Sequence, residues 1–503
     1  MSSPASQHTR AVPLDDSTLH ALPEAVRVPD YDRAALVPAV VHIGVGGFHR
    51  AHQGVYLDEL ASTGETGWGL VGVGMRSPEM GEVLNAQDRL YLVVERAAEE
   101  DRTAVVGVMT RYLHAPEDPE AVLATLADER TRLVTLTITG TSYLVDAHTG
   151  EFAGEDDDEV AADLQDPAHP STVFGYVVEA LARRRRDGVP PFTVLSCDNM
   201  QSNGQAARTA ITSFARLRDA DLADWVEQEV AFPSSMVDRI TPATTPEERD
   251  QIAADVGVAD RWPVVTEPFR QWVVEDSFSH GRPPLDRVGV QFVADVAPYE
   301  EMKTRLLNAG HTALGYLGYL AGFRTTDELM ADPVFRRYLT TMMAEEIVPG
   351  LQEVPGVDLA AYQQTLVERL ANPRMGDQLA RLCRRGSTKV PNYLLPSIRA
   401  AQQEGRSYRL LALAVAGWIR FLRGYDYAGE STPVEGPRMH LVDVAREAGA
   451  DPRPLLSDAD VFGDLGEDEA FVAVVEEHLQ ALEAHGPREV LESCLALSQG
   501  GAT

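Results

Sequence analysis

The sequence predicts an α/β protein in which an N-terminal Rossmann-like, doubly wound domain precedes a mainly α-helical C-terminal domain. Short apolar runs with strand character alternate with helical stretches through the first part of the chain, and the first run ends in a glycine-rich turn. Strand signals cease from about residue 299, where helical periodicity takes over. We therefore expect one domain over residues 1–295 and a second over residues 296–503.

Length and composition agree with two domains and exclude several function classes. A chain of 503 residues is too long to fold around one ordinary hydrophobic core, and its 44% hydrophobic residues suffice for large buried cores. The formal net charge of −33 argues against nucleic acid and anionic membrane surfaces as partners. The longest apolar stretch, residues 410–419, is far too short for a membrane span and reads as a core helix.

Cysteine usage and the N-terminus bear on the compartment. Cys197, Cys383 and Cys494 are odd in number and widely spaced, which argues against a disulfide framework and against a zinc cluster. The first ten residues lack the apolar segment of a signal peptide. We expect a cytoplasmic protein; a monomer is compatible with the sequence, which carries no signal for the oligomeric state.

The first domain is expected to contain a series of strands that alternate with helices. The first covers residues 39–43. Six further apolar runs follow it, at residues 70–74, 90–95, 104–109, 133–139, 192–196 and 288–292. Their alternation with helical stretches is typical of a doubly wound sheet. One helical stretch, residues 172–182, is followed by the arginine run 183–186, which we attribute to the favourable interaction of cations with a helix C-terminus.

The turn after the first strand has the composition of a phosphate-binding loop. Gly44, Gly46, Gly47 and Phe48 lead into a helix, where backbone N–H groups favour the negative charge of a dinucleotide pyrophosphate. His49 stands where the third glycine of the usual motif is expected, so a turn without a ligand remains the alternative. No carboxylate or thiol pattern accompanies the histidines of this loop, which we interpret as loop structure rather than as metal ligands.

A second polar position follows the strand 192–196. Asp198 and Asn199 fall at its carboxyl end, where open α/β sheets bind their ligands. A simple Asx turn is the alternative.

The most informative run lies just inside the second domain. Pro298 suits the first turn of a helix that carries Lys303, Asn308 and His311 among apolar residues. At about 100° per residue, Asn308 lies about 140° and His311 about 80° around the helix axis from Lys303, so all three can line one wall of a cleft. A buried amine tends to lose its proton and can act as a general base. A surface lysine on an amphipathic helix is the alternative.

Several long, ordered and widely separated motifs together resemble a known family. They occupy residues 44–53, 196–199, 232–242, 303–311 and 389–391. This set resembles the mannitol dehydrogenase family of polyol-specific long-chain dehydrogenases/reductases, over about residues 30–430. The resemblance implies a metal-independent, zinc-independent, NAD(P)-linked enzyme that interconverts a sugar alcohol and its ketose. Since small-molecule sites often lie between domains, we expect cofactor and substrate in a cleft between the two. D-Mannitol and D-fructose are the first expectation, and D-arabinitol or a keto-uronate of the fructuronate type is the alternative.

The resemblance also implies roles for individual residues. Lys303 is the general base, and Asn199 and Asn308 are the donors to the developing oxyanion. His311 orients the substrate or the lysine, and Glu300 passes the proton to solvent. Three further positions match those that hold the remaining hydroxyls of the polyol, namely Asp238, Arg381 and Lys389. A nucleotide-binding regulatory protein without turnover, the alternative from a different class, would be expected to lack part of this set.

The choice of cofactor depends on the residues after the second strand. Arg76 would accept the 2′-phosphate of NADP, whereas Glu79 would bind the ribose of NAD and repel that phosphate. The resemblance favours NAD and leaves NADP open. Gly140 departs from the family pattern, which commonly has glutamate there, and this leaves the substrate preference and the pH optimum open.

Overall fold

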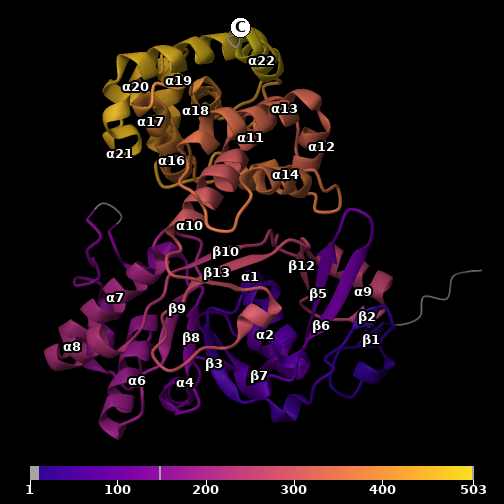
Figure 1. Ribbon diagram of the computed structural model, residues 1–503, viewed down its shortest axis with the longest axis vertical. Coiled ribbons are helices and arrows are strands. Elements are labelled where there is room, and N and C mark those ends of the chain that lie inside the picture. Colours follow the sequence, from indigo (N-terminus) through magenta and orange to yellow (C-terminus); the bar gives the residue numbers. More distant parts are fainter. Residues whose placement is uncertain (1–10, 147–148, 501–503) are drawn as a thin grey trace, which may run out of the picture. The chain divides into compact units, whose positions relative to one another are not determined.

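The computed structural model describes residues 11–146 and 149–500. The chain divides into two compact units, residues 1–297 and 298–503 (Figure 1). The first ten residues, in which we found no signal-peptide character, lie outside the described residues.

A five-stranded parallel sheet forms the centre of the first unit. In chain order its strands are β3 (Pro38–Ile43), β4 (Gly69–Gly74), β7 (Met109–His114), β8 (Leu133–Leu136) and β9 (Thr193–Ser196). They lie side by side in the order β7-β4-β3-β8-β9, and every neighbouring pair is parallel. Counted along the chain, this is the order 3-2-1-4-5 of the doubly wound fold, so the predicted fold class is confirmed.

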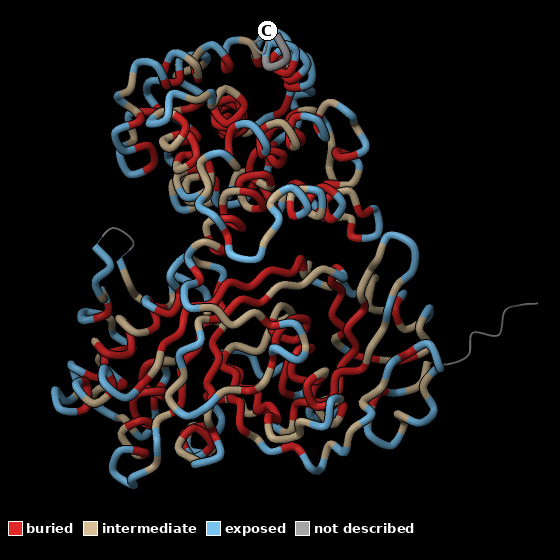
Figure 2. The backbone as a smooth tube through the Cα atoms, viewed as in Figure 1, coloured by how far each residue is buried: buried red, intermediate tan, exposed pale blue. Residues whose placement is uncertain are grey.

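Helices cover both faces of this sheet because successive residues of a strand point to opposite faces. Val41 and Ile43 belong to a core shared with α4 (Pro119–Ala127), α6 (Val173–Asp187), α7 (Asn203–Arg218) and α8 (Ala220–Glu229). Val40 belongs to the opposite core, shared with α2 (Gln53–Ser62) and α3 (Glu79–Ala86). Figure 2 shows the central strands as nearly continuous buried segments. Three further helices complete the unit: α1 (Gly47–Ala51), α5 (Asp158–Gln165) and α9 (Pro246–Val256).

Accessory sheets surround the parallel one, and here the sequence-based expectation was wrong. The apolar run 104–109 was expected as one strand but spans the end of β6 and the start of β7, and only β7 joins the parallel sheet. The runs 90–95 and 288–292 also lie outside that sheet. One accessory sheet has the strand order β12 (Val264–Thr266), β5 (Tyr91–Arg96), β6 (Asp101–Val106) and β2 (Val26–Arg27). A second has the order β10 (Ser235–Asp238), β13 (Gln271–Glu275) and β14 (Gln291–Val293). A third pairs β1 (Val12–Pro13) with β11 (Val258–Ala259). An apolar run indicates a strand without specifying its partner.

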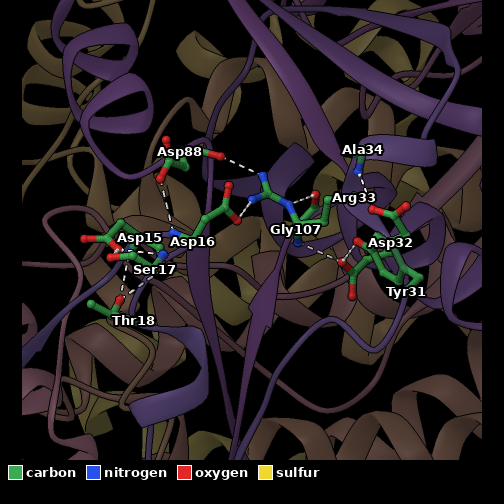
Figure 3. A network of polar contacts seen from close by, with 11 residues as sticks. Asp15, Asp16, Ser17, Thr18, Tyr31, Asp32, Arg33, Ala34, Asp88 and Gly107 are labelled. Carbon is green, nitrogen blue, oxygen red and sulfur yellow. Dashed lines mark hydrogen bonds and ion pairs between the residues drawn. The ribbon is translucent and has the colours of Figure 1, made fainter.

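A polar network fastens the N-terminal segment to the turn between β6 and β7 (Figure 3). Arg33 donates hydrogen bonds to the carbonyls of Gly107 (2.9 Å) and Asp88 (2.6 Å). The buried carboxylate of Asp58 accepts from the Gly107 N–H (2.8 Å) and from the Tyr31 hydroxyl (2.6 Å). Burial raises the pKa of Asp58, and these donors stabilise its charged form.

The second unit is helical, with no strand among its described residues 298–500. Its helices include α10 (Ala297–Lys303), α11 (Ala309–Leu320), α12 (Thr326–Ala331), α13 (Pro333–Thr341), α14 (Leu359–Leu370), α15 (Leu379–Cys383), α16 (Gly386–Lys389), α17 (Leu395–Gln403), α18 (Arg409–Phe421), α19 (His440–Ala448), α20 (Arg453–Leu456), α21 (Ala459–Phe462) and α22 (Glu469–Gly500). The apolar α18 is buried from Leu410 to Phe421, as expected of a core helix. None of the described helices combines the length and the apolar character needed to cross a bilayer.

Three π-turns interrupt the helices of this unit: η6 (Thr304–Asn308), η7 (Met342–Ile347) and η9 (Val390–Leu394). The regular α-helix expected from Lys303 to His311 is therefore wrong over five residues. Because a π-turn closes i→i+5 hydrogen bonds, it holds one residue more per turn than an α-helix. Asn308 consequently lies closer to the face of Lys303 than the 140° that α-helical spacing implies.

One member of the arginine run 183–186 has a role beyond the one expected from the helix C-terminus. Helix α6 continues through the run to Asp187, and Arg184 is fully buried. The Arg184 guanidinium donates to three backbone carbonyls, those of Leu126 (3.0 Å), Asp128 (2.7 Å) and Pro190 (2.7 Å). The helix dipole accounts for cations at this end but not for a buried guanidinium, which here ties α6 to the end of α4 and to the segment before β9.

Replacing Arg184 with methionine is expected to lower the free energy of unfolding by about 2–5 kcal/mol, because three buried carbonyls lose their donor. The measurement is chemical denaturation followed by a signal from the first unit. Arg185→Met is the matched control, since Arg185 is exposed on the same helix, and it is expected to change the free energy by less than about 0.5 kcal/mol. Equal effects of the two substitutions would contradict the role of Arg184.

Candidate functional site

The glycine-rich turn after β3 forms a backbone cradle. Gly44 has φ +99°, and a Cβ atom there would lie 2.2 Å from the carbonyl oxygen of Thr137, so the position requires glycine. Gly46 is the N-cap of α1 and Gly47 its first residue. A Cβ atom at either glycine would meet no protein atom closer than 3.8 Å. The space beside Gly46 and Gly47 is therefore open for a ligand.

His42 holds the ends of β3 and β8 together. Its Nδ1 lies 2.8 Å from the Thr135 hydroxyl and its Nε2 lies 2.9 Å from the Thr137 hydroxyl. Since Thr137 Oγ1 donates to the Gly44 carbonyl (2.8 Å), His42 Nε2 must be the protonated nitrogen, and Nδ1 accepts from Thr135. Burial lowers the pKa of His42 to about 3, so this arrangement stays neutral and fixed across the physiological range.

A cleft of about 700 Å³ opens at the carboxyl ends of β3, β4 and β8. Gly44, Arg76, Glu79 and Thr137 line it, so the structure brings the glycine turn together with both residues expected to read the cofactor ribose. The carbonyl of Arg76 accepts a hydrogen bond from His114 Nε2 at 2.8 Å, which fixes its backbone at the end of β4. The volume is in the range of small-molecule sites, and the position is the usual one for ligands of doubly wound sheets.

Asp198 and Asn199 differ in their surroundings. The buried carboxylate of Asp198 accepts hydrogen bonds from the N–H groups of Ile138 (3.1 Å) and Thr139 (2.8 Å) and from the Tyr143 hydroxyl (2.8 Å). Asp198 thereby fixes the loop after β8. Asn199, by contrast, is exposed just after the end of β9. Their positions in the sequence alone did not separate these two environments.

Two further expected positions lie in the first unit. Asp238 ends β10 and is buried. Gly140 opens the short 3-10 turn η4 (Gly140–Tyr143) and is exposed. A Cβ atom there would lie 3.3 Å from Met200 Sδ, the end of a flexible side chain.

The second unit holds the proposed proton-handling residues. Glu300 and Lys303 lie on α10, with 8% and 6% of their surface exposed. Asn308 is the last residue of η6 and precedes α11; its carbonyl accepts from the Thr312 hydroxyl at 2.8 Å. His311 lies in the first turn of α11, and its Nε2 is buried without a hydrogen-bond partner in the part of the chain that the structure describes. Burial lowers the pKa of His311 to about 3, so the ring is neutral.

Arg381 and Lys389 lie near His311. Helix α11 packs against α15, α16 and η9, and the charges of Arg381 and Lys389 help to lower the pKa of His311. Lys389 Nζ donates to the Leu382 carbonyl at 2.8 Å, and burial lowers the pKa of Lys389 to about 8. The structure thus groups three expected residues within one unit.

Asp377 is a member of this group that the sequence reasoning missed. Its buried carboxylate receives both Nε (2.8 Å) and Nη2 of Arg381, a bidentate pair. The i,i+4 spacing of Asp377 and Arg381 was the available signal, but that spacing is common on exposed helices.

No three His, Cys, Asp or Glu side chains within residues 11–146 and 149–500 are placed to hold a metal ion. Cys197, Cys383 and Cys494 are all free thiols and buried.

Comparison with known proteins places the chain in a family. Residues 38–287 match the model of the mannitol dehydrogenase Rossmann domain, and residues 295–483 match that of the mannitol dehydrogenase C-terminal domain. Mannitol 2-dehydrogenase of Aspergillus terreus is 44% identical over 475 residues, covering 92% of this chain and 94% of that protein. Mannitol dehydrogenase 2 of Saccharomyces cerevisiae is 41% identical, covering 97% and 99%.

Two solved structures are similar over nearly the whole chain. One is Pseudomonas fluorescens mannitol 2-dehydrogenase in a ternary complex with NAD and D-mannitol, with TM-score 0.87 and 41% identity over 96% of this chain and all of that one. The other is a D-sorbitol dehydrogenase in substrate-free form, with TM-score 0.89 and 36% identity over 95% of this chain and all of that one. The resemblance seen in the separate motifs is confirmed, and the chain belongs to the mannitol dehydrogenase family.

Proposed function

We propose that this protein oxidises D-mannitol to D-fructose with NAD, and catalyses the reverse reaction, without a metal ion and with Lys303 as the general base. The observation that carries the proposal is a buried lysine directly before a π-turn that ends at Asn308. One turn further on lies the Nε2 atom of His311, which has no hydrogen-bond partner among the described residues. Relatives that are 41–46% identical carry the names mannitol dehydrogenase or mannitol 2-dehydrogenase, which supports the choice of substrate.

The residues of the first unit fit a dinucleotide. Gly44, Gly46 and Gly47, with Phe48, would hold the pyrophosphate against the start of α1, where no side chain fills the space. Arg76 and Glu79 line the same cleft and would face the adenosine ribose. When bound, NAD supplies the acceptor for the hydride that leaves the substrate carbon.

Lys303 would act on the substrate hydroxyl. As the carbon loses hydride, the hydroxyl oxygen must lose its proton, and the neutral amine of Lys303 would take that proton at Nζ. Glu300 lies three residues earlier on the same helix and is also buried. Its carboxylate would receive the proton from Lys303 and pass it to water.

The remaining residues would stabilise and orient the reacting group. As the C–O bond gains carbonyl character, the amide N–H groups of Asn199 and Asn308 would donate to the oxygen. The neutral ring of His311 would orient the substrate hydroxyl through Nε2, which has no partner within the described chain. Asp238, Arg381 and Lys389 would hold the other hydroxyls.

D-Sorbitol, D-arabinitol and a keto-uronate such as fructuronate are the competing substrates. The likeness to a D-sorbitol dehydrogenase applies to the first of these. The keto-uronate is the least compatible, because the guanidinium of Arg381 is already paired with the Asp377 carboxylate and Asp238 would repel a second carboxylate.

The proposed function is tested by measuring reduced cofactor with a panel of sugar alcohols and ketoses. We expect kcat/KM to be highest for D-mannitol and D-fructose with NAD, and EDTA to leave the rate unchanged, because proton transfer is assigned to Lys303. A tenfold preference for fructuronate over fructose would refute the substrate. Activity lost with EDTA and restored by zinc would refute the metal-free mechanism.

Lys303→Ala is expected to lower kcat by about 10²–10⁴-fold while the dissociation constant of NAD stays close to that of the wild type, because the amine acts on the proton. Lys303→Arg is the matched control: it keeps a cation that cannot give up its proton at neutral pH, and it is expected to be equally inactive. Retention of more than about a tenth of kcat in either variant would show that Lys303 is not the base.

Glu79→Lys is expected to raise kcat/KM for NADP about tenfold or more, since a 2′-phosphate brings up to two negative charges to this side of the cleft and about 1.4 kcal/mol is tenfold. Glu82→Lys is the matched control. Glu82 is exposed on the same helix and lines a neighbouring groove rather than this cleft, so the same charge change there should have little effect. Equal gains in both variants, or none at Glu79, would point to Arg76 as the residue that reads the ribose.

A further inference from the structure

Thr139, which lines the cleft of about 700 Å³ in the first unit, has a backbone conformation that threonine rarely adopts. Its φ is +73° and its ψ is 143°. Among the described residues other than glycine, six have positive φ, and Thr139 is the only β-branched one. Branching at Cβ makes this region unfavourable, so the conformation persists only where its surroundings enforce it. Strained residues of this kind concentrate at ligand sites.

The strained residue opens a short turn in the wall of the cleft. Turn η4 follows Thr139, whose carbonyl accepts a hydrogen bond from the Ser142 N–H at 3.0 Å. Leu144, at the other end of the turn, also has positive φ, +52°. Three residues of this segment that carry hydroxyl groups line the cleft: Thr139, Thr141 and Ser142. Hydroxyl groups both donate and accept, so this wall suits the ribose and phosphate groups of a dinucleotide.

Asp198 holds this turn from the end of the neighbouring strand β9. Its buried carboxylate accepts hydrogen bonds from residues before, at and after the strained position. Oδ1 receives the Thr139 N–H at 2.8 Å, and Oδ2 receives the Ile138 N–H at 3.1 Å and the Tyr143 hydroxyl at 2.8 Å. Because both oxygens are in use, any rotation of the carboxylate breaks at least one of these bonds. Asp198 therefore enforces the conformation of Thr139.

The main chain of Asp198 is fixed separately from its side chain. Asn203 in α7 is fully buried, and its Nδ2 donates to the carbonyls of Asp198 (3.0 Å) and Ser235 (2.8 Å). Asn203 Oδ1 accepts from the Ser235 N–H at 2.9 Å. A change of the Asp198 side chain therefore acts on the turn at Thr139 and leaves the main chain beside Asn199 held by Asn203.

We propose that Asp198 is a positioning residue for NAD: its carboxylate keeps Thr139 in the strained conformation and so keeps the turn 139–144 in the shape that receives the dinucleotide. This inference rests on the proposed function, which assigns NAD to this cleft, and adds a residue that acts through the turn. Without the carboxylate, Thr139 should relax to negative φ and change the course of the cleft wall. NAD would then bind only the fraction of molecules in which the turn has re-formed, so its dissociation constant should rise.

The test is a double-mutant cycle in the full-length protein, with the dissociation constant of NAD as the measurement. Asp198→Asn keeps the size of the side chain but replaces one acceptor oxygen with a donor, and it should weaken NAD binding about tenfold or more. Glycine adopts positive φ without strain, so Thr139→Gly should make the carboxylate dispensable. In a protein that already carries Thr139→Gly, adding Asp198→Asn should weaken NAD binding by less than about threefold.

Thr141→Gly is the matched control, because Thr141 belongs to the same turn and lines the same cleft but does not have positive φ. Glycine at 141 relieves no strain, so Asp198→Asn should still weaken NAD binding about tenfold in that background. A second measurement separates positioning from a general loss of structure. Since Asn203 still holds the main chain of Asp198, kcat at saturating NAD should fall by a smaller factor than the dissociation constant of NAD rises.

Four outcomes would overturn the inference: Asp198→Asn binding NAD as tightly as the wild type, an equally large effect of Asp198→Asn with Thr139→Gly present, an equal rescue by Thr141→Gly, or a double variant at 139 and 198 that does not fold. If Asp198→Asn alone does not fold, comparing Thr139→Gly with the double variant still decides. A wild type that binds no NAD would refute the proposed function instead. A wild type that binds NAD, combined with no rescue by Thr139→Gly, would refute the role of Asp198 alone.

Discussion

The first unit depends on the close approach of β3 and β8 at their carboxyl ends. A chain of hydrogen bonds fixes that spacing, from Thr135 through the ring of His42 to Thr137 and the Gly44 carbonyl. Gly44 must be glycine because Thr137 occupies the place of its side chain. Gly44 and Thr137 both line the cleft, so one buried, neutral histidine helps to fix the glycine turn and the wall of the cleft beside it.

In the second unit the corresponding constraint is a departure from regular helix geometry. Lys303 and Lys389 each precede a π-turn, and the two π-turns pack together within that unit. An extra residue in a helical turn re-aims the side chains that follow it without ending the helix. Asn308 and His311 therefore share a helix with Lys303, but their directions are set by the turn rather than by the α-helical repeat.

The sequence predicted the doubly wound class and the helical second domain because both depend on patterns that repeat over many residues. It failed where one side chain or one extra residue decides the structure. The run 104–109 is split because β6 ends at Val106 and β7 begins at Met109 in another sheet, and neither this break nor the π-turn at 304–308 leaves a trace in apolar periodicity. Arg184 was treated as one of four cations at a helix C-terminus, yet it alone of the four is fully buried, and the carbonyls of Leu126, Asp128 and Pro190 converge on it.

The candidate site likewise has features that the sequence predicted and features that it could not predict. The motifs identified its members, since a resemblance carries residue types and their order. The motifs did not show that Asp377 already holds Arg381, that Asp198 fixes a loop rather than facing a ligand, or that Lys389 is bonded to Leu382. Each of these depends on a neighbour brought close by folding, and the neighbour decides which atoms of a side chain remain for a ligand. Residue identity alone made Arg381 and Lys389 equivalent cations. Their surroundings make one the partner of a buried carboxylate and the other an amine that is bonded to a backbone carbonyl and whose pKa burial lowers to about 8.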